Sequence, residues 1–127
     1  MSWTITEFSD APIIETTYQG MMSPKELGDA VKATTDRVAA TGKHLLLGDC
    51  RELAGGHSVF DLYAVVEELD RAGTGRTMRE AILVPGSSVP AEMTRFWATA
   101  CANRGIKVEV FSDRDAALAW LGSDGHR

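Results

Sequence analysis

The stretch from His44 to Tyr63 joins a short apolar strand to the start of a helix. Leu45–Leu47 form an unbroken apolar run, which is typical of a central strand buried on both faces. The run ends at Gly48–Arg51, and Ser58 stands beyond a glycine-containing loop, where a helix is expected to begin. Polar groups therefore gather at the carboxyl end of a buried strand, where open α/β sheets usually bind ligands.

The same alternation of strand and helix runs along the whole chain and predicts an α/β fold. Residues with high β-propensity form an N-terminal hairpin, and four strand-helix units follow the first strand. The predicted elements are strands at Trp3–Phe8 and Ile13–Tyr18, a helix between Ser23 and Gly42, a strand at Leu45–Leu47, a helix at Ser58–Ala72 closed by Gly73, a strand at Ala81–Val84 stopped by Pro85-Gly86, a helix from near Ser88 to Asn103, a strand at Ile106–Phe111 and a last helix capped by Ser112.

Local signals define the helix starts and the exposure of the last strand. Ser23–Glu26 is a capping box with proline at the first helical position. Ile106, Val108 and Val110 alternate with charged residues, as in an edge strand with one solvated face. Because crossovers between parallel strands are right-handed, a consecutive strand order would gather the helices on one face of the sheet. The other face would then stay partly open.

Composition excludes several classes of function. A chain of 127 residues holds one domain, which we expect to span residues 1–122, with a flexible tail at 123–127. The net charge of -5 argues against nucleic acid as a partner. No apolar run approaches the roughly 20 residues of a transmembrane helix, and no secretory signal is evident, so we expect a cytoplasmic protein. The two cysteines match no zinc-ligand spacing, and the glycine loop is not a nucleotide-binding motif, so we expect no metal and no cofactor.

The candidate binding rim gathers around the end of the central strand. It comprises Asp49, Cys50, Arg51, His57, Ser58, Phe60 and Trp97. Two neighbouring helix starts would bring Phe60 near Trp97, where aromatic side chains line an apolar pocket or a partner surface. Asp49 and Arg51 are expected to form ion pairs that hold the loop.

Two chemical interpretations of the rim stay open. Cys50 and His57, with a neighbouring aspartate to orient the base, supply the parts of an activated thiol, although their spacing matches no nucleophile motif. The helix start at Gly55–Ser58 offers backbone N–H groups to an anion, or makes Ser58 a phosphorylation site. The simpler interpretation is that Ser58 caps its own helix.

Several segments together resemble one family. They are Leu47–Arg51, Gly56–Tyr63, Arg95–Trp97 with Ala100-Cys101, and Val110–Asp115 with Ala117–Leu121. With the hairpin and the four strand-helix units, they resemble STAS and anti-sigma-factor antagonist domains. The resemblance is closer to the small bacterial SpoIIAA-like proteins grouped as STAS/SEC14 domain proteins. It implies a four-turn β-α superhelix with a mixed five-stranded sheet, in which the N-terminal hairpin precedes parallel strands, and about four helices.

The resemblance also implies a non-enzymatic regulatory or ligand-binding module. In anti-sigma-factor antagonists, a partner kinase phosphorylates a serine at the start of the helix after the central strand, and Ser58 falls at that place. His57 before it and Val59-Phe60 after it depart from the acidic residue and the serine-glycine pair of those proteins. The SEC14 side of the resemblance implies an apolar ligand such as a lipid, in an open or shared site.

We therefore expect the rim to dock a protein partner, a second copy of the chain, or a small apolar or anionic molecule. A homodimer is the default expectation because a half-open sheet needs cover and symmetric dimers are common. A lipid-binding SEC14-like carrier is the first alternative. A small enzyme that uses Cys50 and His57 is the second.

Overall fold

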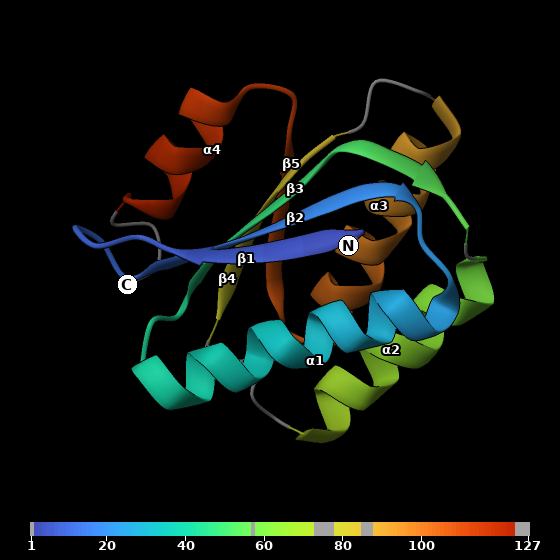
Figure 1. Cartoon of the computed structure of the whole chain (residues 1–127), viewed down its shortest axis with the longest axis horizontal. Helices are drawn as coiled ribbons and strands as arrows, with labels where there is room; N and C mark the ends of the chain where they lie inside the picture. Colours follow the sequence, from blue (N-terminus) through green and yellow to red (C-terminus); the bar gives the residue numbers. More distant parts are fainter. Residues whose placement is uncertain (1, 57, 73–77, 85–87, 124–127) are drawn as a thin grey trace.

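One five-stranded sheet organises the chain, as the computed structural model in Figure 1 shows. The structure describes residues 2–56, 58–72, 78–84 and 88–123. The predicted stops at Gly73 and Pro85-Gly86, and the tail from residue 124, lie outside the described residues. The elements are β1 (Trp3–Glu7), β2 (Ile13–Met21), α1 (Pro24–Thr41), β3 (Leu45–Gly55), α2 (Val59–Ala72), β4 (Arg79–Leu83), α3 (Ser88–Ala102), β5 (Lys107–Phe111) and α4 (Arg114–Leu121).

The strands lie in the order β1-β2-β3-β4-β5. β1 pairs antiparallel with β2, and the remaining neighbours pair in parallel. The predicted mixed sheet, with an N-terminal hairpin and then parallel strands, is confirmed. β5 lies at the edge of the sheet, and Lys107 and Glu109 are exposed on it, as the alternating pattern predicted.

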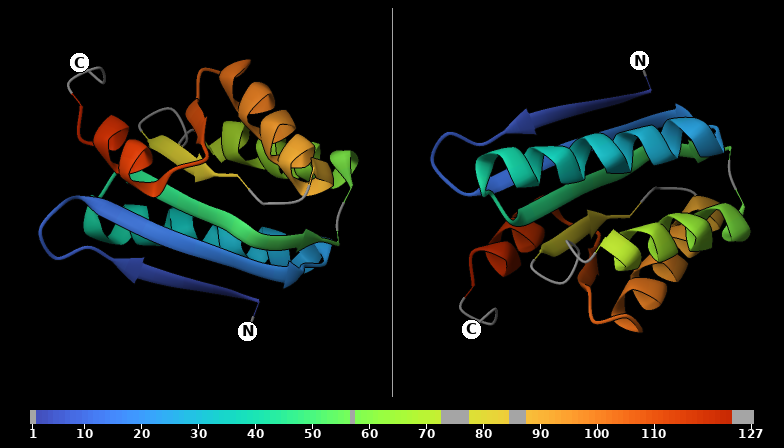
Figure 2. Two further views of the ribbon diagram at one scale, coloured as in Figure 1. Left: turned by 90° about the horizontal axis from the view of Figure 1, so that it is seen from above. Right: turned by 90° about the horizontal axis from the view of Figure 1, so that it is seen from below.

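Successive residues of the central strands face opposite sides of the sheet and supply two cores. Leu46 joins the larger core, to which α1, α2 and α3 contribute, whereas Leu45 and Leu47 join the smaller core, to which α4 contributes. In Figure 2, α1 lies behind the strands in the view from above and in front of them in the view from below. Three helices thus gather on one face, and α4 covers part of the other. α4 follows the last strand and is not a crossover, so the handedness rule does not fix its side.

The main difference from the sequence prediction is the length of β3. It runs from Leu45 to Gly55, so the polar segment after Leu47 is strand and not loop. β2 continues to Met21 and supplies hydrogen-bonding partners through the pair Thr17↔Asp49 and, after register shifts, through Met21↔Gly55. A polar segment remains in a strand where a neighbour pairs with its backbone and water reaches one face.

The helix caps match the prediction at α1 and differ at α4. The capping box of α1 is present, and Gly42 ends this helix with φ 75°, a conformation that glycine adopts easily. α4 is capped by Asp113, whose carboxylate accepts from Ala116 N at 2.9 Å, so the prediction of Ser112 was wrong by one residue. Either residue type caps well. In the helix that begins at Arg114, Ala117 and Leu121 are completely buried against the sheet.

Candidate functional site

A cavity of about 260 Å³ lies between the sheet and the three helices α1–α3. β2, β3 and β4 form one wall, and the helices form the others. Most of its lining side chains are apolar. They include Leu27 and Val31 of α1, Leu53 of β3, Leu62 of α2, and Met93 and Trp97 of α3.

Glu80 of β4 places a carboxylate in this apolar cavity. Its Oε1 accepts a hydrogen bond from Nε1 of Trp97 at 3.0 Å. Burial raises the pKa of Glu80 to about 7, and the hydrogen bond from Trp97 opposes this shift only in part. Among the lining residues that the structure describes, Glu80 is the one Asp, Glu, Lys or Arg. A carboxylate with a raised pKa in an apolar cavity is a physical marker of a functional site.

Gly48 of β3 leaves room for this carboxylate. A Cβ atom at Gly48 would lie 3.2 Å from Glu80 Oε2, which is a tight contact, and 3.8 Å from the ring of Tyr18, so a side chain here would crowd the carboxylate. Burial raises the pKa of the Tyr18 hydroxyl well above its usual value, and the charge of Glu80 adds to the effect. Tyr18 therefore stays neutral beside the carboxylate.

Cys50 also lines the cavity, but its environment opposes nucleophilic chemistry. Its side chain is buried, burial raises its pKa well above the usual value, and Glu80 and Asp49 raise it further. The thiolate is the reactive form of cysteine, so a thiol held protonated is a poor nucleophile. Cys101 of α3 is fully buried, and burial shifts its pKa in the same direction. His57, the expected base, lies outside the described residues.

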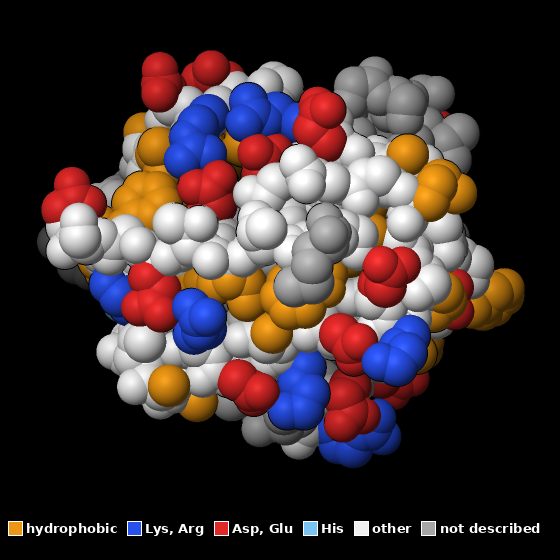
Figure 3. Space-filling model, in the orientation of Figure 1, with side chains coloured by type: hydrophobic (Ala, Val, Ile, Leu, Met, Phe, Trp, Pro, Cys, Tyr) orange, Lys and Arg blue, Asp and Glu red, His pale blue; other side chains and the backbone are white. Residues whose placement is uncertain are grey.

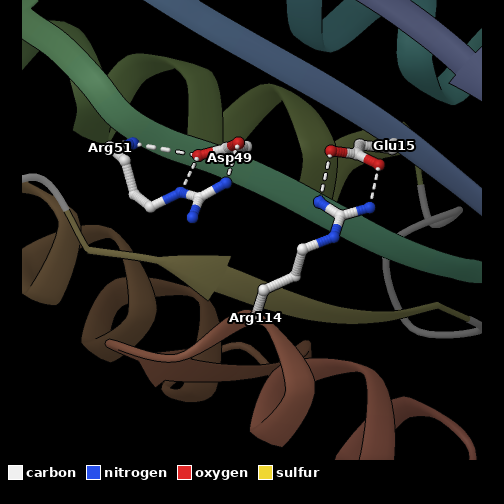
Figure 4. Close-up of polar contacts among 4 residues, drawn as sticks. All are labelled: Glu15, Asp49, Arg51 and Arg114. Carbon is white, nitrogen blue, oxygen red and sulfur yellow. Dashed lines mark hydrogen bonds and ion pairs between the residues drawn. The ribbon is translucent and has the colours of Figure 1, made fainter.

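Asp49 and Arg51 alternate along β3 with Gly48 and Cys50, which line the cavity, and therefore lie on the opposite face of the sheet. Figure 4 shows them on this face together with Arg114 of α4. Asp49 Oδ1 accepts from Arg51 N at 3.1 Å and Nε at 3.0 Å, and Oδ2 accepts from Nη2 at 2.9 Å. These hydrogen bonds hold the pKa of Asp49 below its usual range, although burial opposes them. The expected ion pair is present, but it lies on a strand rather than on a loop.

A second ion pair, which sequence reasoning missed, lies on the same face (Figure 4). Arg114 of α4 donates two hydrogen bonds to Glu15 of β2, each of 2.8 Å. In Figure 3, acidic and basic side chains gather next to one another close to α4. The two residues are 99 positions apart, so no local signal in the sequence pairs them.

At the start of α2, the structure places Ser58 in a cap. Ser58 Oγ accepts from Asp61 N at 3.2 Å, while Ser58 N and Oγ both donate to Asp61 Oδ2, at 2.7 and 3.0 Å. Phe60 is 85 % exposed and is not part of the cavity lining, whereas Trp97 is 9 % exposed and is part of it. The structure therefore separates the rim into three places. Cys50 and Trp97 line the cavity, Asp49 and Arg51 lie on the opposite face, and Ser58 and Phe60 lie at the start of α2.

Glu80 is the functional candidate that sequence reasoning missed. The predicted strand began at Ala81, so Glu80 fell just outside it. The available signal was the period of two in strands. Extending the strand by two residues places Glu80 on the same face as Ile82, which belongs to the larger core.

Comparison with known proteins agrees with this architecture. The sequence model of the SpoIIAA-like family matches residues 13–122. Among solved structures, the chain is similar to an uncharacterised protein of the DUF3478 family with a SpoIIAA-like fold from Shewanella loihica. That match has 22 % sequence identity and a TM-score of 0.58, and it covers 94 % of this chain and 91 % of the other. A search of curated proteins found no match.

The fold is that of a small α/β domain. Domains of the family whose model matches often serve as regulatory interaction modules. The chain belongs to the SpoIIAA-like family. Within the described part of the chain, no three His, Cys, Asp or Glu residues are grouped so that they could hold a metal ion. Over the same residues, no helix combines the length and hydropathy needed to cross a membrane.

Proposed function

We propose that this SpoIIAA-like domain is a non-enzymatic module that binds a small, mostly apolar molecule in the cavity beneath α1–α3. The observation that carries the proposal is the cavity itself, about 260 Å³ of space walled mainly by apolar side chains. Binding sites for small molecules are typically concave and apolar, with a few polar groups that fix the orientation of the ligand. Here Glu80 is such a polar group.

The size of the cavity favours a small ligand over a whole lipid. Pockets for drug-sized molecules span roughly 300–1,000 Å³, so about 260 Å³ holds a single ring system or a short acyl segment. A long acyl chain would extend out of the cavity into solvent. The SEC14-like alternative therefore takes a restricted form, in which only part of a lipid is enclosed. The carboxylate of Glu80 also disfavours an anionic ligand in this cavity.

Two observations support a binding role over catalysis. Both thiols are buried and have raised pKa values, so neither is poised as a nucleophile. The carboxylate of Asp49 is engaged by Arg51 on the other face of the sheet. SpoIIAA-like domains, moreover, are generally not enzymes.

Native mass spectrometry of the gently purified protein tests the proposal. We expect a mass above that of the chain, lost on denaturation and recovered in an organic extract. Ala54 is exposed and lines the cavity, so Ala54→Trp should block the cavity and abolish the added mass. Ala64 is exposed on α2 and does not line the cavity, so Ala64→Trp is the matched control and should retain the added mass. An unliganded wild-type protein that takes up nothing from an extract of the producing cells would contradict the proposal.

A second candidate function is the docking of a protein regulator or a second copy of the chain at the start of α2. Phe60 is 85 % exposed and Tyr63, about one turn further along the helix, is 44 % exposed. Exposed aromatic residues are enriched at interfaces between proteins. Phe60→Ser should then weaken partner binding or dimerisation, measured by light scattering and pull-down, while leaving small-molecule binding unchanged.

A further inference from the structure

Glu80 raises a question that an apolar ligand alone does not answer. A carboxylate facing a hydrocarbon surface loses its hydration, and that loss is costly without a compensating partner. Among the residues that the structure describes, Trp97 is the one hydrogen-bond donor to Glu80, and it reaches Oε1. The other oxygen, Oε2, lies beside Gly48, and both residues line the cavity.

We propose that the ligand of this cavity is an apolar molecule that carries a protonated amine, and that Glu80 Oε2 accepts a hydrogen bond from this amine. The inference rests on the proposed function, and it adds the chemical class of the ligand. The apolar body fills the space between Leu27, Leu53 and Leu62, and the ammonium group pairs with the carboxylate at the wall formed by the sheet.

The geometry prepares Glu80 for this role. The hydrogen bond from the Trp97 indole occupies Oε1 and holds the carboxylate in one orientation. The absence of a side chain at Gly48 leaves the space next to Oε2 open, since a Cβ there would approach it to 3.2 Å. Glu80 is half-buried, and an ammonium group beside such a carboxylate forms a charge-assisted hydrogen bond, which is stronger than a bond between neutral groups.

The surroundings of Glu80 do not already supply a cation from the cavity wall. Tyr18 of β2, Cys50 of β3 and Cys101 of α3 lie within electrostatic range, and the charge of Glu80 raises the pKa of all three. Lys107 of β5 borders a separate void of about 20 Å³ that Glu80 also lines, but its side chain does not line the main cavity. Arg104 of α3 lowers the pKa of Cys101 and is not part of either lining. A cationic ligand would therefore provide the missing counter-charge.

The titration of Glu80 predicts how the affinity for the ligand depends on pH. Because burial raises the pKa of Glu80 to about 7, this group is largely protonated at pH 5 and largely ionised at pH 8. An alkyl amine stays protonated across this range, as lysine does. Affinity for the amine should therefore rise between pH 5 and pH 8. Affinity for an uncharged apolar ligand should not rise, because the ionised carboxylate would lose hydration without gaining a partner.

The test uses three probes with the same phenyl body, namely 2-phenylethylamine, propylbenzene and 3-phenylpropionate. Binding is followed through the indole N–H signal of Trp97 in two-dimensional NMR spectra of the full chain, assigned with the Trp97→Phe variant. At pH 8 we expect the amine to bind at least about tenfold more tightly than propylbenzene, and the anion to bind more weakly than either. Glu80→Gln should reduce the affinity for the amine to that for propylbenzene. Glu109→Gln, an exposed change of the same charge on β5, should leave it unchanged.

The outcomes separate the two proposals. Equal binding of the amine and propylbenzene, an amine affinity that does not depend on pH, or an unchanged preference in Glu80→Gln would overturn the inference and leave an apolar site in place. Tighter binding of 3-phenylpropionate would do the same. Failure of all three probes to shift the Trp97 signal at millimolar concentration would overturn this inference and count against the apolar cavity as a ligand site.

Discussion

Two carboxylates on neighbouring strands, Asp49 on β3 and Glu80 on β4, face opposite sides of one sheet, and their pKa values are shifted in opposite directions. Arg51 donates three hydrogen bonds to Asp49 and lowers its pKa. Glu80 has the neutral indole of Trp97 as its partner, and burial raises its pKa to about 7. Burial raises the pKa of both groups and is the largest cause at Glu80, whereas the hydrogen bonds from Arg51 outweigh it at Asp49.

This comparison distinguishes a face whose charges are paired from the face at which we propose that a ligand binds. On the α4 side, Asp49 and Glu15 each have an arginine partner, and the second pair ties α4 to β2. On the side of α1–α3, the sheet presents apolar residues and one carboxylate without a cation among the described residues that line the cavity. Charges that are paired with one another stabilise the fold. A charge that has no counter-ion in a cavity is available to bind a ligand.

The largest effect should come from breaking the packing of α4. Leu121 is fully buried in the smaller core, so Leu121→Ala should lower the free energy of unfolding by about 2–5 kcal/mol, measured by urea titration. Leu118 is only partly buried there, so Leu118→Ala should cost less. If the faces are independent, the folded fraction of Leu121→Ala should bind 2-phenylethylamine as the wild type does. A changed affinity would mean that α4 shapes the cavity.

The next largest effect should be a pH-dependent gain in the stability of the Glu80→Gln variant. The folded-state pKa of Glu80, about 7, lies above its ordinary value of 4.5, so the native state loses stability relative to the unfolded state as pH rises from about 4.5 to 7. Glu80→Gln removes this loss. The variant should match the wild type near pH 4 and exceed it by roughly 2 kcal/mol at pH 8. Glu109→Gln is the control. If the free energy of unfolding of Glu80→Gln ran parallel to that of the wild type across this pH range, Glu80 would have to be solvated in the native state.

Removing Arg114, the cationic partner of Glu15 on the α4 side, should lower the free energy of unfolding. The loss should be smaller than the gain expected for Glu80→Gln. Arg114→Ala leaves Glu15 without its two hydrogen bonds and should lower the free energy of unfolding by about 1–2 kcal/mol. Arg71 pairs with Glu68 on an exposed helix surface, so Arg71→Ala is a matched control and should cost less than about 0.5 kcal/mol. Equal losses in chemical denaturation would show that the Glu15–Arg114 pair adds nothing beyond a surface contact.

The alternation of strand and helix was enough to predict the sheet, its hairpin and its four helices, because these follow from local periodicity and caps. The polar run Asp49–Glu52 was interpreted as a loop because its polarity is usually typical of one. β2 pairs with that segment and holds it in the strand, and this pairing is a long-range contact. Local sequence signals carry no information of that kind.

The cavity was harder to predict than the fold. Its walls come from six elements, and the space depends on how three helices pack over the sheet. The importance of Glu80 depends on Trp97, 17 residues away, and on the missing side chain at Gly48. The rim was placed at the end of the central strand from a general rule for α/β sheets, and that rule pointed to Cys50, which lines the cavity. Trp97 was included because two helix starts were expected to lie side by side, and neither argument pointed to the carboxylate.

The smallest effect concerns Ser58, which lies on neither face. Its hydroxyl caps α2 and lies 3.0 Å from Asp61 Oδ2, so a phosphate on Ser58 would be repelled by that carboxylate. Ser58→Ala should lower stability by about 1 kcal/mol through the lost cap. Ser58→Glu should leave both small-molecule affinity and pull-down of partners unchanged, because the resemblance to phosphorylated antagonists does not extend to the residues around the serine. A Ser58→Glu protein that releases a partner bound by Ser58→Ala would instead make the start of α2 a charge-operated switch, independent of the cavity.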